Sequence, residues 1–93
     1  MLILHVTYTA KAGMAREFVN ALEKDAAIKV RAEKGNICYD YFFSAADENK
    51  VLLVEKWEDE ASLAAHMEIP HMRDIQAIKE KYIENTVLEK YKV

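Results

Sequence analysis

Three histidines are the side chains of this sequence best suited to move a proton at neutral pH: His5, His66 and His71. An imidazole of ordinary pKa, about 6.5, is an effective general base there. His66 follows Leu63 by three residues, close to the core-facing side of a predicted helix, and is the leading candidate. A structural role is the alternative. Because Pro70 separates His66 from His71, the two do not form an i, i+4 pair of metal ligands, and we expect no metal site.

Aromatic and acidic side chains at strand positions accompany the histidines. The only tryptophan, Trp57, is a candidate wall for a flat substrate, and Tyr41 is a candidate hydrogen-bond donor to a substrate oxygen. Packing in the core or at an interface is the alternative interpretation of both. Glu55 shares a strand face with Trp57, and burial there would require a partner or a raised pKa. His5 lies in a predicted strand and is a further candidate for substrate contact.

Hydrophobic periodicity divides the chain into strands and helices. Alternation of apolar residues predicts strands, and apolar residues three and four apart predict helices. Gly13 and Gly35 favour turns at the two ends of the first helix. Asp59 is the expected N-cap of a later helix, and Pro70 the expected break after it. The predicted strands span residues 1–9, 36–44, 51–57 and 85–93, and the predicted helices span 14–34, 59–67 and 71–82.

The order β-α-β-β-α-β predicts an α+β fold of the ferredoxin-like split βαβ type. In that fold the helices cover one face of a four-stranded antiparallel sheet. The other face of this sheet would carry Ile, Val, Tyr and Phe side chains, too apolar a surface for a monomer in water. We therefore expect a homodimer formed through this sheet face.

Composition excludes several classes of function. Thirteen Lys and Arg against sixteen Asp and Glu give a net charge of −3, which does not favour binding to nucleic acid. No apolar run is long enough to span a membrane, and a length of 93 residues predicts a single domain over residues 1–93. The lone Cys38 suits a reducing compartment, and the N-terminus lacks the pattern of a signal peptide, so we expect a cytoplasmic protein.

Three motifs, in this order along the chain, resemble one protein family. They are Gly35-Asn36-x-x-Tyr39-Asp40, Glu55-x-Trp57-Glu58 and Leu63-x-x-His66-x-x-x-Pro70-His71. Together they resemble the antibiotic biosynthesis monooxygenase (ABM) domain, most closely its small quinol monooxygenase-like members. The resemblance implies a ferredoxin-like protomer that pairs into a dimeric α/β barrel. It also implies oxygenation of small phenols or quinols by O2, without a metal, flavin or haem cofactor.

Within this resemblance His66 is the expected catalytic base, because the family motif carries this histidine. Trp57 and Tyr41 are expected to line a substrate cavity, with His71 and His5 as further substrate-binding candidates. An isomerase of a small phosphorylated carbonyl compound is one alternative, since that branch shares the pattern from His66 to His71. It would need a cationic clamp, for which the candidates are Arg16, Arg31 and Arg73. A non-catalytic dimeric module, either binding small molecules or associated with stress, is the other alternative.

Overall fold

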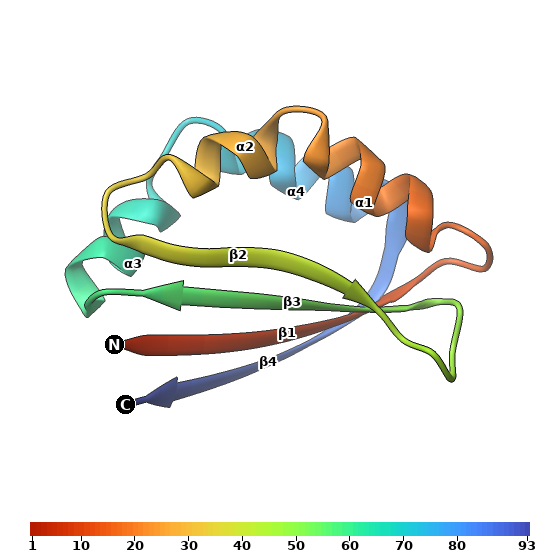
Figure 1. Cartoon of the computed structure of the whole chain (residues 1–93). Helices are drawn as coiled ribbons and strands as arrows, with labels where there is room; N and C mark the ends of the chain where they lie inside the picture. Colours follow the sequence, from red (N-terminus) through yellow and green to blue (C-terminus); the bar gives the residue numbers. More distant parts are fainter.

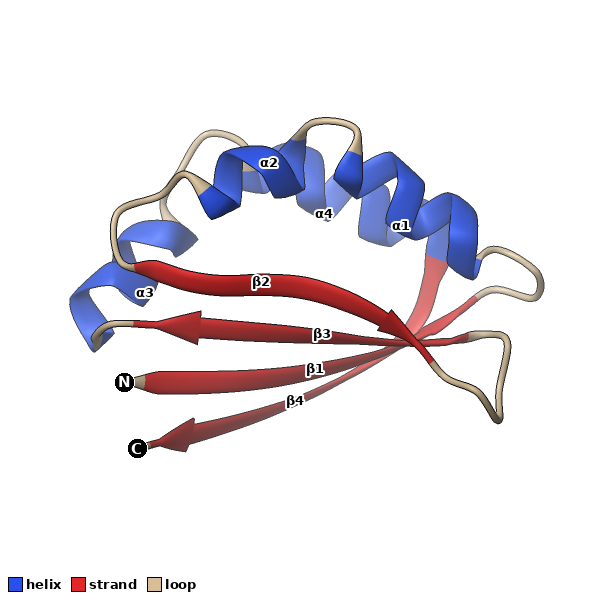
Figure 2. Ribbon diagram, in the orientation of Figure 1, coloured by secondary structure: helices blue, strands red, loops and turns tan.

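A four-stranded antiparallel sheet with helices on one face forms the computed structural model, which describes residues 1–93 (Figures 1 and 2). This is the predicted ferredoxin-like α+β fold. The elements, in chain order, are β1 (Leu2–Ala10), α1 (Ala15–Glu23), α2 (Ala26–Arg31), β2 (Asn36–Phe43), β3 (Lys50–Trp57), α3 (Glu60–Met67), α4 (Met72–Tyr82) and β4 (Ile83–Lys92).

The strands lie in the order β2-β3-β1-β4, so that the N-terminal and C-terminal strands are neighbours. In β1, alternate side chains from Leu2 to Tyr8 are buried beneath the helices, as the period of two predicts. We call the opposite side of the sheet its outer face. Its residues include Ile3, His5, Thr7, Phe42, Leu52, Val54, Val87 and Tyr91, which the strand register places side by side.

The helix expected over residues 14–34 is interrupted, and this corrects the sequence-based prediction. The chain leaves helical geometry at Asp25, whose φ is −150°, and α1 and α2 form on either side of it. Asp25 lies on the apolar stripe of the predicted helix, and a carboxylate buried there without a partner would be costly. The break instead leaves its side chain 63% exposed, 2.9 Å from Lys29, while Ala26 and Val30 stay buried.

The chain between β3 and β4 folds as Asp59 and Pro70 predict. The Asp59 carboxylate accepts a hydrogen bond of 2.8 Å from the backbone N–H of Ser62 and so caps α3. The helix ends at Met67, and α4 begins after Pro70 at Met72. This arrangement holds α3 at one end of the sheet, beside the chain termini in Figure 1.

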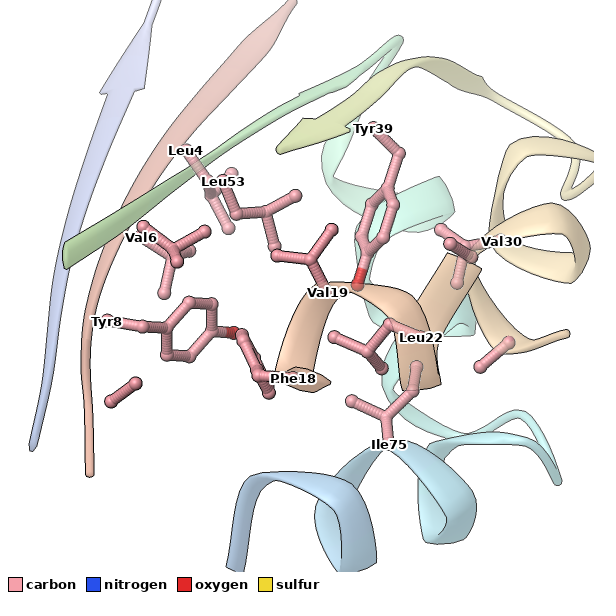
Figure 3. Close-up of a cluster of buried hydrophobic side chains, with 14 of the residues drawn as sticks. Leu4, Val6, Tyr8, Phe18, Val19, Leu22, Val30, Tyr39, Leu53 and Ile75 are labelled. Carbon is pink, nitrogen blue, oxygen red and sulfur yellow. The ribbon is translucent and has the colours of Figure 1, made fainter. Parts of the chain in front are cut away.

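The core lies between the sheet and the helical layer. Figure 3 shows how Leu53 on β3, Phe18 and Leu22 on α1, and Ile75 on α4 converge there. Trp57 and Val30 are also completely buried. The helices cover little of the edge strand β4. Its Leu88 side chain lies on the helix side of the sheet and is still 59% exposed. None of the helices combines the length and the apolar character of a membrane-spanning segment.

Candidate active site

A cavity of about 180 Å³ lies between the sheet and helices α3 and α4. Its apolar wall includes side chains from both layers, namely Leu4, Val6, Leu63, Met72, Ile75 and Leu88. Five side chains with chemistry of their own also line it: Tyr8, Tyr39, Glu55, His66 and Lys79. The cavity therefore combines an apolar wall with a few polar groups, the usual composition of a small-molecule site.

His66 projects from α3 into this cavity and is only 4% exposed. Its Nδ1 lies 2.9 and 3.1 Å from the two carboxylate oxygens of Glu33. Because a carboxylate oxygen accepts hydrogen bonds, Nδ1 carries a proton, and in the neutral imidazole the lone pair is on Nε2. Every side-chain nitrogen or oxygen atom that is fully buried has a hydrogen-bond partner. Because Nε2 of His66 has no such partner, it is not fully buried. Because His66 lines the cavity, we infer that Nε2 is the atom that it presents there.

Glu33 joins the two motif histidines. His71 Nε2 donates to the same Glu33 oxygen, Oε2, at 3.0 Å. The three side chains come from the turn after α2, from α3 and from the start of α4, and all are largely buried. His71 does not line the cavity. In the structure it holds Glu33, which in turn fixes the ring of His66.

Trp57 was predicted to line the cavity, but it does not. It packs against His66 from the core. Its indole is completely buried, with its ring centroid 4.7 Å from that of His66. Its Nε1 donates a hydrogen bond of 3.1 Å to Oε1 of Glu55. The sequence predicted that Trp57 contacts the substrate. In the structure its side chain points into the core, beside His66 of α3. One tryptophan thus packs against His66 and orients Glu55.

Glu55 is a buried carboxyl group, 7% exposed, in the wall of the cavity. Burial raises its pKa, and the hydrogen bond from Trp57 and the charges of His66 and Lys79 oppose that effect. A buried Glu55 was expected to have either a partner or a raised pKa, and it has both. Oε1 is occupied by Trp57, and Oε2 makes no hydrogen bond to the protein and is not sealed in the core. Glu55 therefore offers one oxygen to a molecule in the cavity.

Tyr41 lies behind the cavity wall, and Tyr39 takes the lining position. The Tyr41 hydroxyl donates to the Tyr39 hydroxyl at 3.1 Å, and the Tyr41 ring packs edge-on against Phe18. Burial raises the pKa of Tyr8, Tyr39 and Tyr41, so all three are neutral hydroxyls near neutral pH. Tyr41 thus contacts a lining residue, Tyr39, but does not line the cavity itself.

His5 lies on the outer face, on the other side of the sheet from the cavity. Its nearest aromatic neighbour is Tyr91, with ring centroids 5.6 Å apart and edge-on geometry. The structure therefore brings His66, His71 and Trp57 together at one place and leaves His5 apart. Contact of His5 with a substrate stays a prediction, and it is not supported by the geometry of this cavity.

Sequence reasoning missed two charged residues of the site, Glu33 and Lys79. Nothing in the local pattern links Glu33 to His66, which lies 33 residues further along the chain. Lys79 did give a signal, because it stands four residues after Ile75 and seven after Met72, on the apolar side of α4. No group of three or more His, Cys, Asp or Glu side chains is placed to hold a metal ion.

Comparisons with known proteins identify the family of this chain. The profile described as antibiotic biosynthesis monooxygenase matches residues 1–78. The chain belongs to the antibiotic biosynthesis monooxygenase family. The "Putative monooxygenase YcnE" of Bacillus subtilis (strain 168) is 33% identical over 78 residues, which cover 83% of this chain and 80% of YcnE.

Solved structures agree in fold. PA3566 from Pseudomonas aeruginosa is 27% identical, with a TM-score of 0.85 over 99% of this chain and 93% of that one. An ABM protein from Nitrosomonas europaea has a TM-score of 0.88 at 22% identity, over 100% of this chain and 98% of its own. Both solved structures thus share the fold of sheet and helical layer that builds this cavity.

Proposed function

We propose that this ABM protein is a monooxygenase that oxidises small phenols or quinols with O2 and without a metal, flavin or haem. One observation carries the proposal: His66 lines an apolar cavity while Glu33 holds its Nδ1, which leaves Nε2 as the ring nitrogen without a protein partner. This is the arrangement of a general base oriented by a carboxylate. The family and the name of YcnE as a monooxygenase support the class of reaction.

The proposed first step is removal of a proton from the substrate hydroxyl by His66 Nε2. The Glu33 carboxylate then stabilises the imidazolium, because opposite charges attract strongly in a partly buried site. The phenolate left behind transfers an electron to O2 far more readily than a neutral phenol does. One oxygen atom enters the ring and the other leaves as water, so a phenol and O2 give a quinone and water. The substrate itself supplies the electrons that a cofactor would otherwise provide.

The size of the cavity favours a substrate with a single aromatic ring. An apolar cavity of about 150 Å³ in another protein binds benzene. The volume of about 180 Å³ here therefore fits one ring with its substituents. The apolar wall reduces the contact of the ring with water, which strengthens the interactions of the reacting groups. Tyr39 and Glu55 are placed to hydrogen-bond its oxygen atoms.

We propose supporting roles for the other predicted site residues. Trp57 fixes the ring of His66 and the carboxyl group of Glu55. His71 fixes Glu33, and Tyr41 orients the hydroxyl of Tyr39. His5 belongs to the outer face, where we propose that a second protomer packs.

The arginines proposed for a phosphate-binding isomerase do not converge at this cavity. Arg16 stacks over the ring of Phe43 at 4.5 Å, and Arg31 is paired with Glu23 and bound to the carbonyl of Tyr39. Arg73 lies on the exposed side of α4. None of the three lines the cavity, so no clamp for a phosphate dianion is built there, and the geometry favours the oxygenase.

We further propose a homodimer that buries the outer face. Phe42, Val87 and Tyr91 are 52%, 50% and 43% exposed on that face, and Leu52 and Val54 lie between them. Such a set of neighbouring apolar side chains favours association. We also propose that residues 1–93 form one domain and that the protein acts in the cytoplasm, where a free Cys38 is stable.

Oxygen consumption by the purified protein tests the proposed function. The protein, treated with a chelator, is given a panel of single-ring phenols and quinols in an oxygen electrode, and autoxidation is subtracted. We expect uptake that requires the protein, with one quinone formed for each O2 consumed. No uptake above autoxidation on any compound of the panel would contradict the proposal.

A further inference from the structure

Lys79 is the only lysine or arginine in the wall of the cavity, and no carboxylate lies within ion-pair distance of its ammonium group. It stands on the core-facing side of α4, and its Nζ lies 5.4 Å from the centre of the Tyr8 ring. It belongs to none of the ion pairs of the chain and makes no hydrogen bond. The face of the Tyr8 ring is the only partner recorded for this ammonium.

The setting of Lys79 differs from that of the lysines that have a polar partner in this chain. Lys29 and Lys90 reach surface carboxylates, and Lys11 binds carbonyl oxygens at the end of α4. Lys79 is half-buried instead, and this burial lowers the pKa of its ammonium group while Glu55 opposes the effect. A half-buried ammonium without a close anion gains from a negatively charged ligand.

We infer that Lys79 is the residue that recognises the substrate, and that the cavity prefers single-ring aromatic monoanions, such as hydroxybenzoates, to neutral phenols. The inference rests on the proposed function, because it takes the cavity as the substrate site. A single ammonium matches one carboxylate and not a phosphate dianion. The apolar wall receives the ring, and the open Nε2 of His66 receives the hydroxyl group.

Ligand binding without turnover tests this inference separately from the chemistry. Calorimetric titrations under nitrogen compare the three hydroxybenzoate isomers with the corresponding hydroxybenzamides, which have nearly the same shape and no charge. We expect the wild-type protein to bind at least one hydroxybenzoate about tenfold to a hundredfold more tightly than its amide, the effect of one charged hydrogen bond.

Two variants assign the preference to Lys79. Lys79→Met keeps most of the side-chain volume and should reduce the preference to about one, with the affinity for the amide unchanged, whereas Lys79→Arg should keep a preference. Lys81→Met is the matched control, because Lys81 lies over the ring of Tyr82 at 5.2 Å on the same helix but outside the cavity. Circular dichroism checks that each variant is folded.

The outcomes separate the inference from the proposed function. Three results would each overturn the inference. They are equal affinity for the acid and the amide, no binding of either compound, and a preference for the acid that survives in Lys79→Met. A preference that depends on Lys79 in a protein that consumes no O2 would uphold the anion site and refute the oxygenase.

Discussion

At the scale of single residues, the site depends on Glu33, which binds both motif histidines with one carboxylate oxygen. If Glu33 orients His66, the substitution Glu33→Gln should lower kcat by at least about tenfold with little change in KM, because it weakens the general base and leaves the cavity wall intact. Oxygen uptake at several substrate concentrations measures both constants. Glu23→Gln is the control, because it removes a carboxylate that pairs with Arg31 and does not line the cavity. Equal kcat in the two variants would contradict the role of Glu33.

A second prediction at this scale concerns Glu55 and the pH dependence of the free energy of unfolding. Because its pKa is raised on folding, the folded protein holds this proton to a higher pH than the unfolded chain does. The free energy of unfolding should therefore fall as pH rises from the ordinary carboxyl pKa to the raised one. Glu55→Gln cannot ionise and keeps an oxygen for Trp57, so this part of the fall should disappear.

Urea denaturation at a series of pH values measures this effect as the difference between wild type and Glu55→Gln. The difference isolates Glu55 from the other carboxylates, which titrate in both proteins. A difference that stays constant with pH would show that Glu55 titrates alike in the folded and unfolded chains.

At the scale of elements, Gly35 sets the distance between the turn after α2 and helix α3. Its φ is +84°, and the side chain of Ser62 occupies the space where a Cβ would be. Gly35→Ala should cost about 1–2 kcal/mol for the left-handed backbone and about 1–3 kcal/mol more for crowding. Gly13→Ala is the matched control, with a φ of +75° and nothing near the added Cβ, and should show only the first cost. Urea denaturation compares the two, and equal losses would contradict the close packing.

The elements also show how far a sequence alone can go. Alternation predicted the strand β1, and Asp59 and Pro70 predicted the limits of α3, because these are local signals. The break at Asp25 was missed, because helical periodicity continues across it and only the cost of burying the carboxylate decides against a continuous helix.

The candidate site was predicted only in part, for a related reason. His66 was found from its motif, whereas its contact with Glu33 joins residues 33 positions apart and exists only once α3 packs beside the turn after α2. Trp57 was predicted to line the cavity and lies completely buried behind it, because alternation gives the face of a strand but not the depth of a side chain.

At the scale of the whole molecule, the outer face predicts a dimer. Light scattering should give about twice the chain mass of 10.7 kDa. Leu52→Lys, in the middle of this face, should shift the mass to that of a monomer, because the dimer would have to bury an unpaired charge. Ile28→Lys makes the same change on α2, at a residue 58% exposed on the helical side, and should leave the dimer intact. A monomeric wild type, or a dimer unaffected by Leu52→Lys, would contradict this interface.

The central claim is that His66 is the base of a cofactor-free oxygenase, and the rate of oxygen uptake by His66→Gln tests it most directly. On the best substrate of the panel, with chelator present, we expect kcat to fall by about a hundredfold or more, the usual contribution of a general base. His5→Gln, a change of the same kind on the outer face, should keep the wild-type rate per protomer. Wild-type uptake by His66→Gln would contradict the account.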